Sequence, residues 1–136
     1  MTTSTSRHNP TTVWNVPDKF KNIYSHAVEI PAGKRLLFVS GQIGVARDGI
    51  IKSGFLEQCE QSMDNVEELL SAAEMSKVNI VKITYFLARI EDQSDLGEVR
   101  RQRWASAEPP AVTTVVVLAL ARPEYLIEIE VIAAAL

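Results

Sequence analysis

Residues 126–132 read Leu-Ile-Glu-Ile-Glu-Val-Ile, and this stretch decides the fold. Successive side chains of a β-strand point to opposite faces of a sheet, so Glu128 and Glu130 share one face and the residues between them share the other. The two carboxylates lie roughly 7 Å apart along such a strand. Two interpretations stay open: a solvated face or interfacial ion pair, or a general acid/base that orients a water and has its pKa set by partial burial.

Two segments ahead of this strand have helical periodicity. Apolar residues in 55–75 recur at steps of three and four, which predicts one apolar stripe on a long helix. The stripe comprises Leu56, Cys59, Met63, Val66, Leu70 and Ala73. A second helix is expected over 92–105, with Asp92 or Ser94 as its N-cap, and the prolines of Glu108-Pro109-Pro110 prevent its continuation.

The remaining segments have strand composition. They are 25–30, 35–40, 42–46, 50–52, 80–90, 112–120 and 125–133. Turns are expected at Pro31-Ala32-Gly33-Lys34 and at Asp48-Gly49. This order of elements predicts an α+β fold, with one sheet and both helices on one of its faces. The uncovered apolar face of such a sheet would find a partner by oligomerising.

Composition bounds the class of protein. The 136 residues are 46% hydrophobic and 23% charged, which is typical of one globular domain, 1–136, in which the Ser/Thr-rich residues 1–12 are expected to be flexible. The net charge of −3 and the lack of a basic run make a nucleic-acid partner unlikely. No apolar run reaches the ~20 residues of a membrane helix, and no secretory signal is present. With Cys59 the only cysteine, a cytoplasmic location is expected.

A few residues are candidates for chemistry. Ser40-Gly41 at the end of a strand brings bare backbone close to a neighbour, which could be a ligand, another chain or simply a bulge. Tyr24 could line a pocket or be structural. His8 and His26 lack partners at ligand spacing, so no metal site is expected. Cys59, on the apolar stripe, is expected to be inert.

Six segments, taken in order and spacing, resemble the RidA/YjgF family of reactive-intermediate deaminases. The resemblance covers nearly all of residues 24–133. The segments are Tyr24-Ser25-His26-Ala27, Leu37-Phe38-Val39-Ser40-Gly41-Gln42-Ile43-Gly44, Met63-Asp64-Asn65-Val66, Ile80-Val81-Lys82-Ile83-Thr84, Pro110-Ala111 and Ile127-Glu128-Ile129-Glu130.

The resemblance implies a chorismate-mutase-like fold, with a single mixed sheet and two helices on one face, assembled as a homotrimer whose sheets form a central barrel. It further implies clefts between subunits that bind small carboxylates. The best-studied members hydrolyse 2-imino acids and their enamine tautomers to 2-keto acids and ammonia without a cofactor. Some members have also been called endoribonucleases.

Carried over by position, the resemblance implies a site in this chain. Glu128 matches the glutamate that positions or activates the attacking water. Tyr24 matches a tyrosine that lines the site, and Gly41, preceded by Ser40, matches the backbone that approaches the ligand. Thr114 stands where many relatives have a cysteine.

The departure from the family pattern is at Val112. The family signature is Pro-Ala-Arg, whose arginine grips the substrate carboxylate, but this chain reads Pro-Ala-Val. Losing a charge-assisted bidentate contact costs several kcal/mol when the anion is desolvated. Either the substrate differs from a simple 2-imino acid, or another cation substitutes; Arg100, Arg103, Arg89 and Arg122 are the candidates.

Three functions are therefore compared. The first is a hydrolase of imine, enamine or related small C–N substrates, in which Glu128 handles the water. The second is a trimeric small-molecule-binding homologue without deaminase activity, whose cleft Val112 makes apolar. The third, a ribonuclease, is disfavoured because phosphate binding needs positive charge that this acidic chain lacks.

Overall fold

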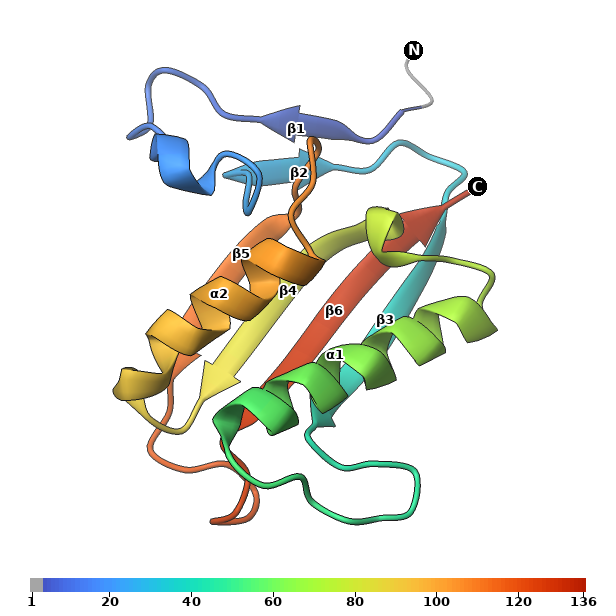
Figure 1. The fold of residues 1–136 in the computed structure, drawn as a ribbon. Helices are drawn as coiled ribbons and strands as arrows, with labels where there is room; N and C mark the ends of the chain where they lie inside the picture. Colours follow the sequence, from blue (N-terminus) through green and yellow to red (C-terminus); the bar gives the residue numbers. More distant parts are fainter. Residues whose placement is uncertain (1–3) are drawn as a thin grey trace.

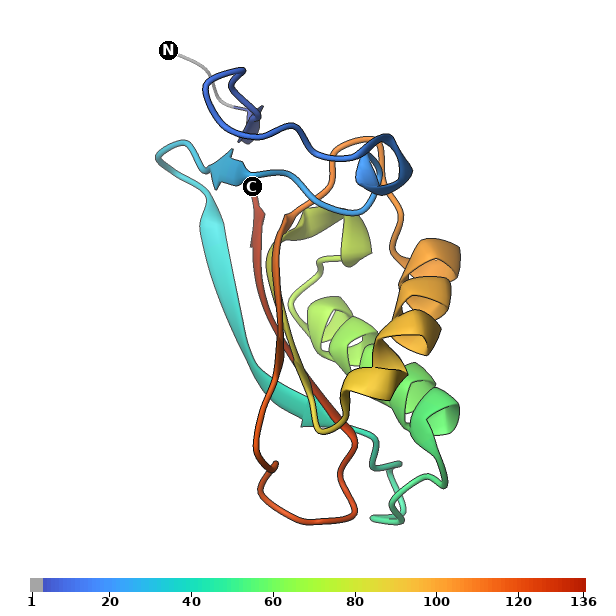
Figure 2. The ribbon, with the colours of Figure 1, turned by 90° about the vertical axis from the view of Figure 1, so that its left-hand side faces the viewer.

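The computed structural model describes residues 4–136. A four-stranded sheet has the strand order β3-β6-β4-β5, and only β4 and β5 are parallel neighbours. Both helices cover the same face of this mixed sheet, so the α+β fold predicted from the sequence is confirmed (Figures 1 and 2). The elements are β1 Ser6–His8, η1 Asp18–Phe20, β2 Ala27–Glu29, β3 Arg35–Ile43, α1 Phe55–Ala72, η2 Lys77–Asn79, β4 Ile80–Leu87, η3 Ile90–Asp92, α2 Gln93–Arg103, β5 Ala111–Val116 and β6 Ile127–Ala135.

The core lies between α1 and the sheet. The predicted stripe of α1 is largely confirmed, because Cys59, Met63, Val66 and Leu70 are fully buried. They belong to one apolar cluster with the inward residues of the sheet, Val39, Ile83, Tyr85, Leu87, Ile127, Ile129 and Val131. Leu56 was placed on the stripe wrongly: it is half exposed, and Phe55 is buried in its place at the first residue of the helix.

The reactivity of the buried Cys59 thiol tests whether the core is packed in this way. Desolvation, together with a smaller effect of the charge of Glu60, raises the pKa of the Cys59 thiol to about 12. Because the thiolate is the reactive form, we expect a disulfide reagent at about pH 8 to label the native protein roughly 1,000-fold more slowly than the protein unfolded in guanidinium. Absorbance of the released thiolate measures both rates, and labelling of the native protein at the unfolded rate would contradict the core described here.

Several elements end earlier than predicted. The strand expected over 80–90 stops at Leu87, and the one expected over 112–120 stops at Val116, after which Leu118 is fully exposed. Asp92 occupies the predicted N-cap position of α2, but its carboxylate binds the Arg89 guanidinium at 2.8 and 2.9 Å instead of capping the helix.

The first strands belong to two different sheets. The turn over 31–34 connects β2 to β3 but does not make them a hairpin: β2 pairs with β1, whereas β3 pairs with β6. Residues 1–12 were expected to be flexible; residues 1–3 lie outside the described part of the chain, Ser6–His8 form β1, and Arg7 Nε donates a hydrogen bond to the Pro109 carbonyl at 3.3 Å. Within residues 4–136, neither helix is long and apolar enough to cross a bilayer.

The second face of the four-stranded sheet, which we call the open face, has no helix over it (Figure 2). Phe38 and Leu36 of β3 are 70% and 51% exposed there. The other side chains of this face follow from the strand register and are Ser40, Lys82, Thr84, Phe86, Thr113, Val115, Glu128, Glu130, Ile132 and Ala134. A monomer would leave this mixed apolar and charged surface in water.

Candidate functional site

Glu128 lies directly beside the bare backbone of Gly41. The register of β3 against β6 shifts between Val39 and Gln42, so Ser40 and Gly41 form a bulge. A Cβ atom built on Gly41 would overlap the Glu128 carboxylate, lying only 2.6 Å from its Cδ. Of the alternatives that the sequence left open, the bulge is therefore confirmed, and the neighbour that needs the missing side chain is Glu128 of the same chain.

Glu128 is half-buried at the end of the open face where β6 begins. Glu130, the next acid of the same strand, is exposed. Ser40, in the same bulge, faces outward beside it. We call Ser40, Gly41 and Glu128 the acid half-site. The resemblance named these three as site residues, and the structure places them side by side, with the Glu128 carboxylate against the Gly41 backbone.

Tyr24 lies elsewhere, in an aromatic cluster that precedes β2. Its ring centroid is 6.1 Å from that of Phe20, 6.4 Å from that of Trp14 and 6.0 Å from that of His26. His26 Nε2 lies 2.6 Å from the Trp14 carbonyl oxygen. Tyr24 and His26 also line a cavity of about 530 Å³ formed by residues of the first 26 positions and Ala107. That volume falls in the range of small-molecule pockets.

Arg100, on α2, joins this cluster from the helix side. Its guanidinium carbon is 5.7 Å from the ring centroid of Phe20 and 5.9 Å from that of Tyr85. The Nε atom of Arg100 is buried without a hydrogen-bond partner among the described residues. Desolvation lowers the pKa of Arg100, and burial raises that of Tyr85. Phe20 and Tyr85 had not been identified from the sequence, where no motif marks them.

Val112 and Thr114 are on the same side of the sheet as Arg100. Val112 is paired with Ile83, and Thr114 with Tyr85, whose side chains face the helices. Val112 packs against the apolar core. We call Tyr24, Arg100, Val112 and Thr114 the cation half-site.

The two half-sites do not meet within one chain. Glu128 is paired with Phe86 on the open face, whereas Arg100 lies against Tyr85 on the helix face. Strand β4 also separates β5, which holds Val112, from β6, which holds Glu128. The structure thus brings the predicted site residues together as two groups on opposite faces of the sheet.

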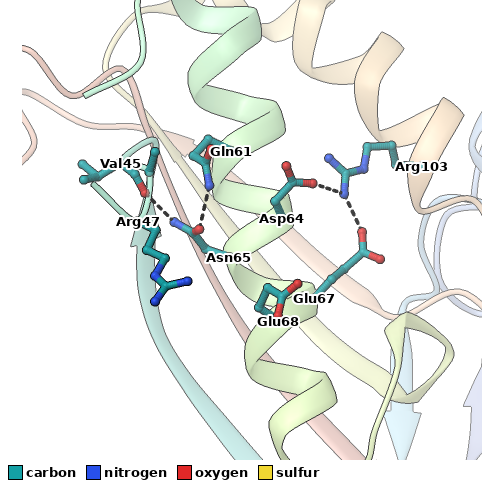
Figure 3. A pocket seen from close by; sticks show the side chains of 9 residues that line it. Val45, Arg47, Gln61, Asp64, Asn65, Glu67, Glu68 and Arg103 are labelled. Carbon is teal, nitrogen blue, oxygen red and sulfur yellow. Dashed lines mark hydrogen bonds and ion pairs between the residues drawn. The ribbon is translucent and has the colours of Figure 1, made fainter. Parts of the chain in front are cut away.

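Arg103 is not available to bind a ligand anion. Its guanidinium forms ion pairs with three carboxylates of α1, at 3.2 Å to Glu60, 2.9 Å to Asp64 and 2.6 Å to Glu67. Figure 3 shows the last two contacts at one side of a pocket between α1 and the loop after β3. The Trp104 indole also donates to Glu67, at 3.2 Å.

The two other arginines considered from the sequence are also paired. Arg89 binds Asp92, and Arg122 binds Glu124 at 2.7 Å. The Arg100 guanidinium makes no hydrogen bond or ion pair within residues 4–136. Of the four candidate cations, it is the one without a carboxylate.

The open face holds one further charged group that sequence reasoning missed. Lys82 of β4 donates from Nζ to Thr113 Oγ1 at 2.7 Å. Desolvation lowers the pKa of Lys82, and the charge of Glu130 opposes that effect. Lys82 and Glu130 line the same hollow of the open face as Phe38 and Ser40.

The mixed four-stranded sheet with two helices on one face is the fold of the Rid proteins. The solved structure of YyfB from Yersinia pestis, a protein of the conserved Rid family, superposes with a TM-score of 0.83 at 29% identity over 96% of this chain and 98% of that one. Residues 17–135 match the family described as Endoribonuclease L-PSP. The chain belongs to this family, which is also called RidA/YjgF.

Two curated relatives are similar in sequence to this chain over part of their length. A 2-iminobutanoate/2-iminopropanoate deaminase of Capra hircus is 36% identical over 88 residues, which is 63% of this chain and 62% of that protein. A RutC family protein of Aquifex aeolicus is 37% identical over 93 residues, covering 66% of this chain and 72% of that protein. The chain thus matches less than two thirds of the length of the goat deaminase.

Proposed function

We propose that this protein is a cofactor-independent hydrolase that deaminates small imines or enamines. The observation that carries the proposal is the Glu128 carboxylate held against Gly41 in a half-buried position. A carboxylate in such a place can accept a proton from water as the water attacks. The names of the relatives, 2-iminobutanoate/2-iminopropanoate deaminases, support the same chemistry.

The proposed reaction needs one water and one proton shuttle. The oxygen of the water bonds to the imine carbon while Glu128 takes a proton from it, and the C=N double bond becomes a single bond. Glu128 then gives this proton to the nitrogen, which yields a carbinolamine. Glu128 next takes the proton of the new hydroxyl group and passes it to the amino nitrogen, so that the C–N bond breaks and ammonia leaves as the carbonyl forms. The carboxylate is regenerated, so neither a metal nor a redox cofactor is needed.

We further propose that the active assembly is a trimer with its site between subunits. Two observations support this: the exposed Phe38 and Leu36 on the open face, and the separation of the acid and cation half-sites within one chain. Packing open faces together would bury the apolar side chains. Because the two half-sites are separated within one chain, a complete site would then need the acid half-site of one copy and the cation half-site of another.

The test is the hydrolysis of 2-iminobutanoate generated in situ by a threonine dehydratase, followed as the rate of imine loss and ammonia release. Glu128→Gln is expected to lower the rate by roughly 100- to 10,000-fold, since the amide accepts no proton. The matched control is Glu130→Gln, which removes an acid from the same face of the same strand and should leave the rate within about twofold. The proposal is wrong if the wild-type protein accelerates decay no more than buffer does.

Val112 favours a second candidate, a trimeric protein that binds a small molecule without deaminating it. The valine packs against the core and offers neither donor nor charge to a substrate carboxylate. In that case, the wild-type protein would bind the product 2-oxobutanoate, or a neutral analogue of it, and leave the rate of imine decay unchanged.

A further inference from the structure

We propose that Arg100 is the specificity-determining cation of this site and binds an anionic group of the substrate, a carboxylate. The inference rests on the hydrolase proposed above and adds the residue that holds the substrate in place of the missing arginine at position 112. It starts from the Nε atom of Arg100, which is buried without an acceptor among the described residues.

A buried N–H without a partner is unfavourable, and more so when it belongs to a charged group. The flanking rings of Phe20 and Tyr85 attract the cation through their faces but accept no strong hydrogen bond. The two rings therefore flank the guanidinium without using its N–H groups as hydrogen-bond donors. A carboxylate that reaches the guanidinium can accept from two of its N–H groups together, which is the bidentate geometry that arginine favours.

The other three candidate arginines already have carboxylate partners, which leaves Arg100 as the cation for the substrate. Arg103 already holds three carboxylates, and Arg89 and Arg122 hold one each, so binding a ligand would require breaking existing ion pairs. Arg100 needs no such exchange. Tyr24 lies in the same cluster, because its ring centroid is 6.1 Å from that of Phe20, over which Arg100 lies at 5.7 Å.

Val112 is consistent with a cation supplied from α2. Its neighbour in register, Ile83, is two residues from Tyr85 on the same face of β4, and Arg100 lies over the Tyr85 ring. Two residues along a strand are separated by roughly 7 Å. A second guanidinium at position 112 would thus lie near the first in a desolvated region, where like charges repel. An apolar residue at position 112 avoids that repulsion.

The experiment is calorimetric titration of the full-length protein with two probes, 2-oxobutanoate and its neutral amide 2-oxobutanamide. Arg100→Met keeps the length and apolar stem of the side chain but removes its charge. We expect this change to weaken binding of 2-oxobutanoate by roughly 10- to 100-fold and to alter binding of the amide less than about threefold. Arg100→Lys should restore part of the affinity, because it restores charge without the bidentate fork.

The matched control is Arg101→Met, which removes the neighbouring arginine that is exposed and paired with Glu98 at 3.2 Å. It should bind both probes as the wild type does. If Arg100→Met binds 2-oxobutanoate as tightly as the wild type, or if it weakens acid and amide equally while thermal unfolding shows a destabilised protein, Arg100 only supports the aromatic cluster and the inference is wrong. It is also wrong if the wild type does not distinguish acid from amide. Failure of the hydrolase proposal is separate: the acid then binds through Arg100, but imine decay is not accelerated.

Discussion

Replacing Gly41 with alanine is expected to lower the rate of imine hydrolysis by roughly 100-fold or more, while lowering the free energy of unfolding by less than about 2 kcal/mol. The two effects differ because of what the new methyl group meets. It overlaps the carboxylate end of Glu128, which can rotate into the open face without moving the backbone. The fold can therefore survive, but the carboxylate leaves the position from which it acts on water.

Denaturant unfolding and the imine-decay assay on the same preparations measure both effects. Gly97→Ala is the control, because a Cβ atom there meets nothing within 4 Å and alanine is a better helix former than glycine. That variant should be stabilised by up to about 1 kcal/mol and keep its activity. A Gly41→Ala protein as active as the wild type would show that the position of Glu128 against the bulge is not needed.

Mixing two inactive variants is expected to restore activity. Glu128→Gln removes the acid half-site, and Arg100→Met removes the cation half-site. If each site combines halves from two copies, random trimers made from equal amounts of the two variants have both intact halves at about one site in four, so about a quarter of the wild-type rate should return. Refolding the mixed chains together and measuring imine decay tests this.

The control mixture combines Glu128→Gln with Gly41→Ala. Both changes affect the acid half-site, which comes from a single chain, so no exchange of copies can rebuild it and no activity should return. Recovery in the control mixture, or none in the test mixture when mixed assemblies are shown to form, would mean that the site is not shared in this way.

Periodicity was enough to predict the two helices, the main strands of the four-stranded sheet and the layers, but it missed β1 and placed a strand over 50–52 where the structure has only an isolated bridge. The three- and four-residue spacing of Cys59, Met63 and Val66 marks the buried face of α1, and the alternation in 126–132 places Glu128 and Glu130 on one face of β6. The first turn of α1 shows the limit of predicting burial from periodicity. Phe55 and Leu56 are adjacent apolar residues, and the spacing alone does not decide that Phe55 is the buried one.

Contacts between distant segments could not be predicted from the sequence. Whether Arg103 is free to bind a ligand depends on carboxylates of α1 that lie 36 to 43 positions away in the chain. The surroundings of Arg100 depend on Phe20, which lies 80 positions away. Whether Val112 shares a face with Glu128 depends on the register of two intervening strand pairs. Family resemblance supplied the positions of the site residues, and the structure supplied which of them face one another.

The glycine bulge of β3 has a consequence for the speed of the proposed reaction. A glutamate free to rotate loses up to about 2 kcal/mol of side-chain entropy when it is held in one rotamer. The Gly41 backbone lies against one side of the Glu128 side chain, so part of that loss occurs during folding and not when substrate arrives. Any side chain at position 41 would occupy the place of the carboxylate and turn it away toward the open face.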